Sequence, residues 1–220
     1  MPAQFHPALV PKLYPILDVG MLAARGVDLS LYAKALRAAG VDWLQYRNKQ
    51  GSDQEILRDA NLLRDLFADT PTRLILNDRA DLVTQAKFHG VHVGQMDIAP
   101  AAARGHVGES SIVGVSTHTL EQIAVANATD CDYIAYGPIF ATASKDNPDP
   151  VVGLEGLRAA RRATKKPLVA IGGITRANCR SVLDAGADSI AVISELLPHQ
   201  NVLHPGSVQQ IVEEFFALLA

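Results

Sequence analysis

An amide and two cations alternate from Gln45 to Lys49, at the end of a short apolar segment. Side chains two residues apart point to the same side of an extended chain, so Gln45, Arg47 and Lys49 would face one site if the segment were a strand. Arginine binds oxygens in a fork and lysine supplies a point charge, which together suit a multiply charged anion such as pyrophosphate. On spacing alone, a solvated loop beginning at Arg47 fits equally well.

Two carboxylates follow the next two apolar segments. Asp78 comes directly after residues 73–77, and Asp97 comes after residues 91–93. Mg²⁺ commonly binds one or two carboxylates and completes its shell with water and substrate phosphate oxygens, so the pair predicts a magnesium site beside Arg47 and Lys49. The alternative is that each aspartate caps the helix that follows it, and without the neighbouring cations this alternative would be favoured.

A second set of anion-binding residues lies towards the end of the chain. Gly172 and Gly173 follow the apolar segment 168–171, and Ser194 follows residues 189–193. Many α/β barrels hold a phosphate monoester on backbone N–H groups at these positions, and glycine has no Cβ to obstruct the anion. A tight turn would also explain the glycine pair, but its position favours phosphate.

A long segment that follows residues 133–137 carries further polar groups, namely Thr142, Ser144 and Lys145. The continuation 146–150 is rich in Asp and Pro and suggests a mobile lid, although it could be a flexible loop without that role.

Two separate anion sites imply two phosphate-bearing substrates or products. This favours a bisubstrate transferase over an isomerase.

Eight strand-like segments alternate with helical patterns along the whole chain. The segments are mostly unbroken runs of apolar residues, as expected for parallel strands that are covered on both faces. This pattern predicts a single (β/α)₈ TIM barrel over residues 1–220, with an open doubly wound sheet as the alternative. The carboxyl ends of barrel strands meet at one mouth, which would bring the polar residues together. The expected strands are 13–18, 43–47, 73–77, 91–93, 112–116, 133–137, 168–171 and 189–193; the expected helices are 29–39, 53–67, 80–87, 100–104, one capped by Thr119, 154–164, 176–185 and 208–219.

Composition narrows the class of protein. The chain has 220 residues, of which 48% are hydrophobic, and its formal net charge is −3, so bulk attraction to nucleic acid is excluded. The amino terminus lacks the order of a signal peptide and no apolar stretch is long enough to span a bilayer, which predicts a cytoplasmic protein without a membrane partner. Cys131 and Cys179 lie in different units without a neighbouring Cys or His, so buried free thiols are expected rather than a disulfide or metal site.

The ordered motifs resemble those of the thiamine-phosphate synthase family over residues 14–194. They are Gln45-x-Arg47-x-Lys49, Asn77-Asp78, Gly94-Gln95-x-Asp97, Gly114-Val115-Ser116, the segment 137–145 and Ala170-Ile171-Gly172-Gly173-Ile174. The resemblance implies that 4-amino-2-methyl-5-hydroxymethylpyrimidine pyrophosphate is joined to a thiazole phosphate, which gives thiamine phosphate and pyrophosphate. It implies that the pyrimidine pyrophosphate is held by Gln45, Arg47, Lys49, Asn77, Ser116 and Lys145, that Asp78 and Asp97 bind Mg²⁺, and that the thiazole phosphate is held by Thr142, Ser144, Gly173, Ile193 and Ser194.

Four positions depart from the usual family pattern. Asn48 replaces an acidic residue, Met96 stands where Glu is common, Ala141 replaces a proline, and Ser144 replaces Thr. Ser144 keeps the hydroxyl donor, whereas Ala141 would loosen the lid and Met96 would weaken support of the metal. None of these changes removes a group that is expected to touch substrate or metal.

The chemistry needs no side-chain nucleophile. Loss of pyrophosphate from an electron-rich aminopyrimidine methylene leaves a delocalised cation, which the thiazole nitrogen captures. Arg47, Lys49, Lys145 and Ser116 are the expected catalytic groups, because they would stabilise the leaving pyrophosphate together with Mg²⁺.

Two histidines near these motifs have modest expected roles. His118 is interpreted as a loop residue before the Thr119 cap, although its imidazole could do acid–base work, and His92 as a hydrogen-bonded barrel residue. A metal-independent thiazole tautomerase on the same scaffold and a noncatalytic thiamine-phosphate-binding protein are the alternative functions. A homo-oligomer is compatible with the sequence.

Overall fold

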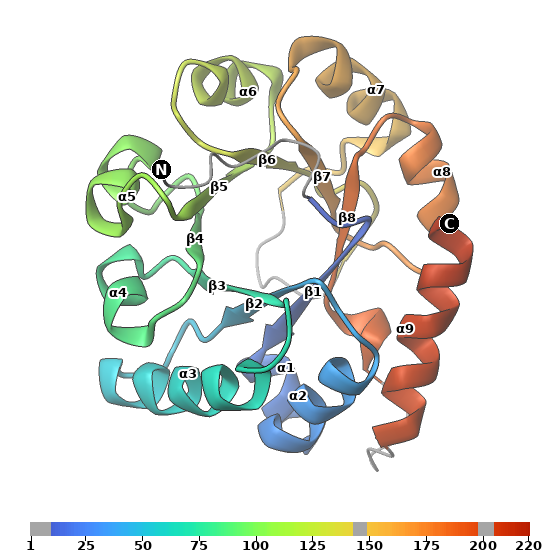
Figure 1. Cartoon of the computed structure of the whole chain (residues 1–220). Helices are drawn as coiled ribbons and strands as arrows, with labels where there is room; N and C mark the ends of the chain where they lie inside the picture. Colours follow the sequence, from blue (N-terminus) through green and yellow to red (C-terminus); the bar gives the residue numbers. More distant parts are fainter. Residues whose placement is uncertain (1–9, 143–148, 198–204) are drawn as a thin grey trace.

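Eight parallel strands close into a barrel in which every strand pairs with its neighbours along the chain. The structure is a computed structural model that describes residues 10–142, 149–197 and 205–220. In Figure 1 the strands form a ring and the helices surround it. The (β/α)₈ prediction is therefore confirmed over the described residues. The strands are β1 (Leu13–Asp18), β2 (Trp43–Arg47), β3 (Arg73–Asn77), β4 (Gly90–Val93), β5 (Ile112–Thr117), β6 (Tyr133–Tyr136), β7 (Leu168–Ile171) and β8 (Ser189–Val192).

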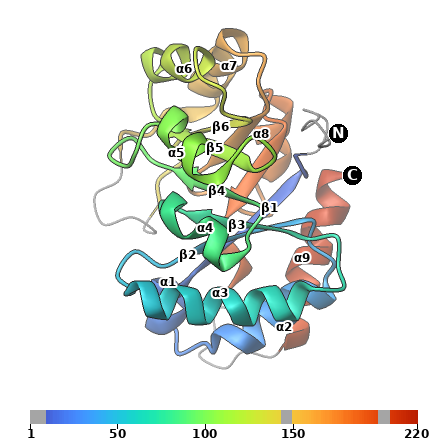
Figure 2. The same cartoon turned by 60° about the vertical axis from the view of Figure 1, so that its left-hand side comes forward.

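The helices lie outside the ring, and α9 packs against α2 and α8 (Figure 2). Two short 3₁₀ helices, η2 and η3, follow β3 and β8. The helical elements are α1 (Val19–Ala24), α2 (Leu29–Ala38), α3 (Asp53–Phe67), η2 (Ala80–Leu82), α4 (Val83–Ala86), α5 (Pro100–Val107), α6 (Leu120–Asn127), α7 (Gly153–Ala163), α8 (Cys179–Asp184), η3 (Ser194–Leu196) and α9 (Pro205–Leu219). None of the helices in the described ranges is long and apolar enough to cross a membrane.

Local sequence signals explain where several helices begin. Ser52 and Glu55 form a capping box at the start of α3. The Thr119 side chain accepts a hydrogen bond from Gln122 N at the start of α6, as expected. The helix α1 was not expected, because its six residues are too few for a periodic pattern; Asp18 caps it. The helix expected over 176–185 begins only at Cys179, since residues 175–178 form a turn closed by Asn178 N and Thr175 O.

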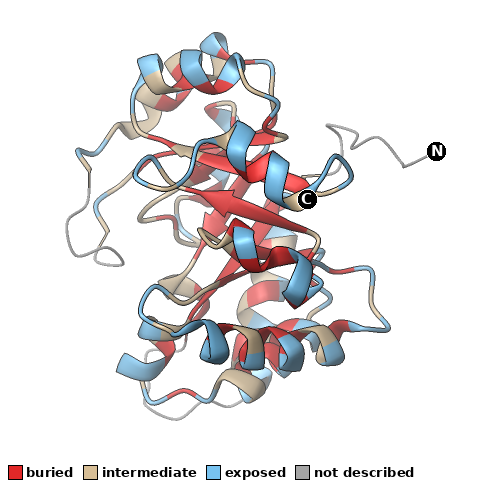
Figure 3. Ribbon diagram, turned by 90° about the vertical axis from the view of Figure 1, so that its left-hand side faces the viewer, coloured by how far each residue is buried: buried red, intermediate tan, exposed pale blue. Residues whose placement is uncertain are grey.

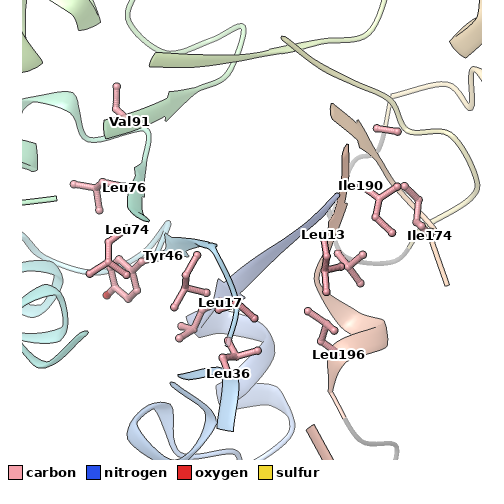
Figure 4. Packing of buried hydrophobic residues seen from close by; sticks show 14 of the residues in the cluster. Leu13, Leu17, Leu36, Tyr46, Leu74, Leu76, Val91, Ile174, Ile190 and Leu196 are labelled. Atoms are coloured by element: carbon pink, nitrogen blue, oxygen red, sulfur yellow. The ribbon is translucent and has the colours of Figure 1, made fainter. Parts of the chain in front are cut away.

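The hydrophobic core has two layers that the barrel wall separates. The larger layer lies between strands and helices, where Leu17, Leu36 and Leu76 are fully or almost fully buried (Figure 4). The smaller layer fills the barrel interior and includes Tyr14 and Tyr133. Figure 3 shows the same division, because the strands are mostly buried while the helices bury mainly one side. Since successive strand residues point to opposite faces, Gln45 and Arg47 share the inward face with Trp43.

Candidate active site

The guanidinium of Arg47 is held at the end of β2 by a carboxylate from β1. Arg47 Nη1 donates to Asp18 Oδ2, and the two residues are register partners. Asp18 is buried, and its other oxygen accepts a hydrogen bond from Met21 N at 2.9 Å. Arg47 is therefore a positioned strand residue, and the alternative of a solvated loop that begins there is wrong. Sequence reasoning missed Asp18, whose only signal was its position at the end of the first expected strand.

Lys49 contacts one of the two aspartates beyond β3 and β4. Its Nζ lies 3.0 Å from Asp78 Oδ2, while half of the Lys49 side chain stays exposed. Burial, together with the neighbouring Asp97, raises the pKa of Asp78, and Lys49 partly offsets this shift. Asp97 in turn accepts a hydrogen bond from Gly94 N at 2.7 Å. Two adjacent carboxylates with one ammonium beside them leave negative charge that a further cation would neutralise.

Neither aspartate caps a helix in the described part of the chain. The residue before η2 is Arg79, and the residue before α5 is Ala99, and neither helix start has a side-chain cap. Asp78 instead takes a left-handed backbone conformation with φ of 64° and donates its N–H to His92 O at 2.8 Å. The capping alternative is therefore wrong for both residues.

Three more of the expected pyrophosphate ligands lie on β2, β3 and β5. Gln45 is buried on β2 and donates from Nε2 to the Tyr14 hydroxyl at 3.1 Å. Asn77 is the half-buried last residue of β3 and is the register partner of His92. Ser116 lies on β5 with its Oγ 2.8 Å from His92 Nε2. Seven expected residues thus converge on the carboxyl ends of β2 to β5: Gln45, Arg47, Lys49, Asn77, Asp78, Asp97 and Ser116.

His92 is a hydrogen-bonded residue of the barrel strand β4, as expected. Its Nδ1 is 2.9 Å from the Tyr133 hydroxyl, and its ring stacks on the Tyr133 ring at a centroid distance of 5.5 Å. Burial lowers the pKa of His92 to about 4, although Asp97 opposes the shift. The imidazole is therefore neutral at neutral pH.

The other expected anion site lies at the ends of β6, β7 and β8. Phe140 N donates to Gly172 O at 3.0 Å, which lays the segment after β6 along the end of β7. Gly173 has a φ of 62°, and its carbonyl accepts a hydrogen bond from Asn178 Nδ2 at 3.0 Å. Thr142 is half-buried on the segment after β6, and Ile193 and Ser194 are half-buried directly after β8. Ser144, Lys145 and the core of the expected lid, 146–148, lie outside the described residues.

His118 precedes the Thr119 cap, and its half-buried imidazole is hydrogen-bonded to a backbone carbonyl. Its Nδ1 donates to Gly137 O at 2.6 Å, because a carbonyl can only accept, and its Nε2 lies 3.3 Å from Asp149 Oδ2. The half-buried ring thus bridges the end of β6 and the start of the segment before α7. The two cysteines are buried free thiols, as expected, and burial raises the pKa of both.

Comparisons with known proteins point in the same direction as this geometry. The family model described as thiamine monophosphate synthase matches residues 13–196. A thiamine-phosphate synthase from Koribacter versatilis (strain Ellin345) is 57% identical over 190 residues, which cover 86% of this chain and 90% of that protein. A thiamine-phosphate synthase from Chloroflexus aurantiacus is 40% identical and covers 87% of each chain. A solved structure of thiamine phosphate pyrophosphorylase from Pyrococcus furiosus has a TM-score of 0.79 at 30% identity, and covers 97% of this chain and 96% of that chain.

Proposed function

The chain belongs to the thiamine monophosphate synthase family, and from that premise we propose how the mouth of its barrel performs the reaction. Membership makes the protein a transferase of thiamine biosynthesis that acts on phosphorylated small molecules. The substrates that we propose are 4-amino-2-methyl-5-hydroxymethylpyrimidine pyrophosphate and 4-methyl-5-(2-phosphoethyl)thiazole. The products are thiamine phosphate and pyrophosphate.

The observation that carries this proposal is the convergence of cations and carboxylates at the ends of β2 to β5. Arg47, fixed by Asp18, presents its remaining guanidinium N–H groups, and Lys49 adds a mobile ammonium beside Asp78. Charge-assisted hydrogen bonds of this kind suit the oxygens of a pyrophosphate. Asn77 and Ser116 would donate from the adjoining strands, Gln45 would contact the pyrimidine from the barrel interior, and Lys145 would approach from the segment after β6.

Asp78 and Asp97 are the residues that would hold Mg²⁺. Their fit rests on two neighbouring carboxylates and on the hard oxygen donors that Mg²⁺ prefers; burial, together with Asp97, raises the pKa of Asp78. The described residues contain no cluster of three or more His, Cys, Asp and Glu side chains suited to a metal, so substrate oxygens would complete the shell. When bound, the ion would supply positive charge to the departing pyrophosphate.

The thiazole phosphate would bind at the ends of β6 to β8. Backbone N–H groups near Gly173 and Ser194 are suited to a phosphate monoester, and the hydroxyls of Thr142 and Ser144 would donate further hydrogen bonds. Ile193 would offer an apolar contact beside them. This arrangement holds the thiazole nitrogen opposite the pyrophosphate site, across the mouth.

The reaction then needs charge stabilisation and alignment from the protein. The bond between the pyrimidine methylene carbon and the pyrophosphate oxygen breaks, and the electron pair leaves with pyrophosphate. The electron-rich ring delocalises the remaining cation, and the thiazole nitrogen supplies the pair for the new C–N bond. Arg47, Lys49, Lys145 and Ser116 stabilise the leaving group, while the two anchored phosphates keep the reacting atoms in line.

A pyrophosphate-release assay tests this function. We expect release only when both substrates and Mg²⁺ are present. A tautomerase would convert a thiazole substrate alone, and a binding protein would retain thiamine phosphate without turnover. The variant Asp78→Asn should lower turnover by about a hundredfold, because one preorganised charge contact is lost. Asp69→Asn removes an exposed carboxylate that pairs with Arg37, and this control should leave turnover unchanged.

The proposal extends to the setting of the enzyme. We propose that it works in the cytoplasm on small molecules, without a membrane as a partner. Its formal net charge of −3 gives no bulk attraction to nucleic acid.

A further inference from the structure

A continuous chain of hydrogen bonds crosses the barrel interior between two of the proposed substrate-binding residues. Gln45 Nε2 lies 3.1 Å from the Tyr14 hydroxyl, which lies 3.1 Å from the Tyr133 hydroxyl. The Tyr133 hydroxyl is 2.9 Å from His92 Nδ1, and His92 Nε2 is 2.8 Å from Ser116 Oγ. The five side chains come from five strands, and we call them the interior relay.

The residues that line the barrel interior leave room for the two tyrosines of this relay. Tyr14 and Tyr133 are almost completely buried, and each contacts Trp43 in an edge-to-face arrangement. A Cβ at Gly114 would lie 2.0 Å from Tyr133 Cζ, so a glycine is required on β5 for the phenol to reach His92. Buried polar groups without partners are costly, so a complete chain of bonds is also the arrangement that stability favours.

The chemistry of the five groups allows two complete proton arrangements. A neutral imidazole has one N–H donor and one acceptor, and each tyrosine hydroxyl has one proton. If Gln45 donates to Tyr14, the Tyr14 hydroxyl donates to Tyr133 and the Tyr133 hydroxyl donates to His92 Nδ1. The imidazole proton is then on Nε2, which donates to Ser116. If instead Ser116 donates to His92, every bond reverses and Gln45 must turn its carbonyl oxygen to Tyr14. Any mixture either leaves a buried hydroxyl proton unpaired or brings two acceptors face to face.

We propose that the interior relay couples Gln45 to Ser116, so that Tyr14, Tyr133 and His92 are positioning residues that set which hydrogen-bonding group each end offers to the substrate. In the arrangement found here, Gln45 Nε2 faces Tyr14 and its carbonyl oxygen is left for the substrate. Ser116 Oγ then accepts from His92, and the Ser116 proton is left for the substrate.

The coupling has a consequence for substrate choice, which rests on the proposed function. A pyrophosphate oxygen can only accept a hydrogen bond, so pyrophosphate at Ser116 requires Ser116 to donate. The relay then fixes Gln45 as an acceptor towards the pyrimidine ring. A ring that offers a donor there, such as an exocyclic amino group, is accepted, whereas an oxo group at the same place meets another acceptor. The enzyme therefore selects an aminopyrimidine through Gln45, whose orientation is set by Tyr14, Tyr133 and His92 behind it.

The test compares Tyr133→Phe with Tyr32→Phe. The first variant cuts the relay and keeps the ring that fits Gly114. The second removes a buried hydroxyl from α2 that has no hydrogen-bond partner among the described residues. Each protein is assayed with the 4-amino substrate and its 4-oxo analogue, and the preference is the ratio of the two kcat/KM values. The intrinsic difference in reactivity between the two substrates is the same for every protein, so it cancels when these ratios are compared. Tyr133→Phe should lower the preference for the amino substrate by about tenfold, and should raise KM for the pyrimidine pyrophosphate without changing KM for the thiazole phosphate. Tyr32→Phe should leave both unchanged.

A double variant separates coupling from simple loss of packing. If the relay acts as one unit, Tyr14→Phe should add little to the loss already caused by Tyr133→Phe. Losses that multiply fully, or a preference ratio that stays within about twofold of the wild type in folded Tyr133→Phe, would overturn the proposal.

A readout without turnover distinguishes failure of the relay from failure of the proposed function. With ¹⁵N-labelled histidine and added Mg²⁺ and inorganic pyrophosphate, NMR should place the His92 proton on Nε2. In Tyr133→Phe without pyrophosphate the proton should be shared between the two nitrogens, because neither neighbour of His92 then fixes its position. A proton on Nδ1 in the wild-type complex refutes the relay, whereas an enzyme that releases no pyrophosphate but shows the Nε2 proton refutes only the function.

Discussion

Gly173 offers a direct test of how closely the segment after β6 packs on the end of β7. The residue has a φ of 62°, and a Cβ there would lie 2.4 Å from Ala141 O and 2.7 Å from Phe140 Cβ. Gly26, in the turn after α1, has the same φ of 62°, but no described atom lies within 4 Å of its would-be Cβ. The two substitutions to alanine therefore share the same backbone strain and differ in the close contact.

The expected magnitudes follow from this pair. A left-handed conformation costs an L-residue about 1–2 kcal/mol, so Gly26→Ala should lower the free energy of unfolding by about that amount. At Gly173 a backbone oxygen must also move, and overpacking typically adds about 1–3 kcal/mol. We expect Gly173→Ala to be less stable than Gly26→Ala by about 1–3 kcal/mol. The displaced segment carries Thr142, so KM for the thiazole phosphate should rise in this variant and not in Gly26→Ala.

Urea denaturation followed by circular dichroism measures the first effect, and steady-state pyrophosphate release at saturating pyrimidine pyrophosphate measures the second. Equal stability of the two variants would refute the close approach of Ala141 to Gly173. A Gly173→Ala enzyme that loses stability while KM for the thiazole phosphate stays unchanged would refute the placement of the thiazole phosphate at this turn.

Three further perturbations address other contacts. Asp18→Asn keeps an oxygen to cap α1 but removes the charge that holds Arg47, so kcat/KM for the pyrimidine pyrophosphate should fall about tenfold with little change in the urea midpoint; an unchanged kcat/KM would contradict the role of Asp18. Asp78→Asn, measured without divalent metal at neutral pH, should unfold at higher urea, because burial and Asp97 raise the pKa of Asp78 and disfavour its charged form; a lower midpoint would show that the Lys49 contact dominates. Burial lowers the pKa of His89, whose Nδ1 accepts a hydrogen bond from Leu74 N, so the unfolded chain binds a proton that the folded state does not. Stability should therefore fall as the pH drops below about 6.5, and the buried His92, whose pKa is also lowered, adds to this decline. His89→Asn should make the decline in urea midpoints less steep, and an unchanged slope would contradict the contribution of His89.

The sequence predicted the barrel because its signals are local. Apolar segments of strand length, glycine or polar stops and the Thr119 cap each depend on a few neighbouring residues, and the structure contains all of these elements. The sequence failed where the decisive partner is distant. Asp18 reaches Arg47 across 29 positions, and His92 reaches Tyr133 across 41. Such partners become visible only once strand register is known, because register decides which side chains share the barrel interior.

The same dependence on register explains why the site can be both polar and rigid. Two of the proposed ligands are supported from a neighbouring strand rather than from their own: Asp18 on β1 supports Arg47 on β2, and His92 on β4 supports Ser116 on β5. A shift of any strand by one residue would turn these side chains out of the barrel and leave their partners buried and unpaired. The hydrogen bonds that orient the substrate-binding groups therefore also penalise wrong registers, so selection for the active-site geometry is at the same time selection for a unique barrel.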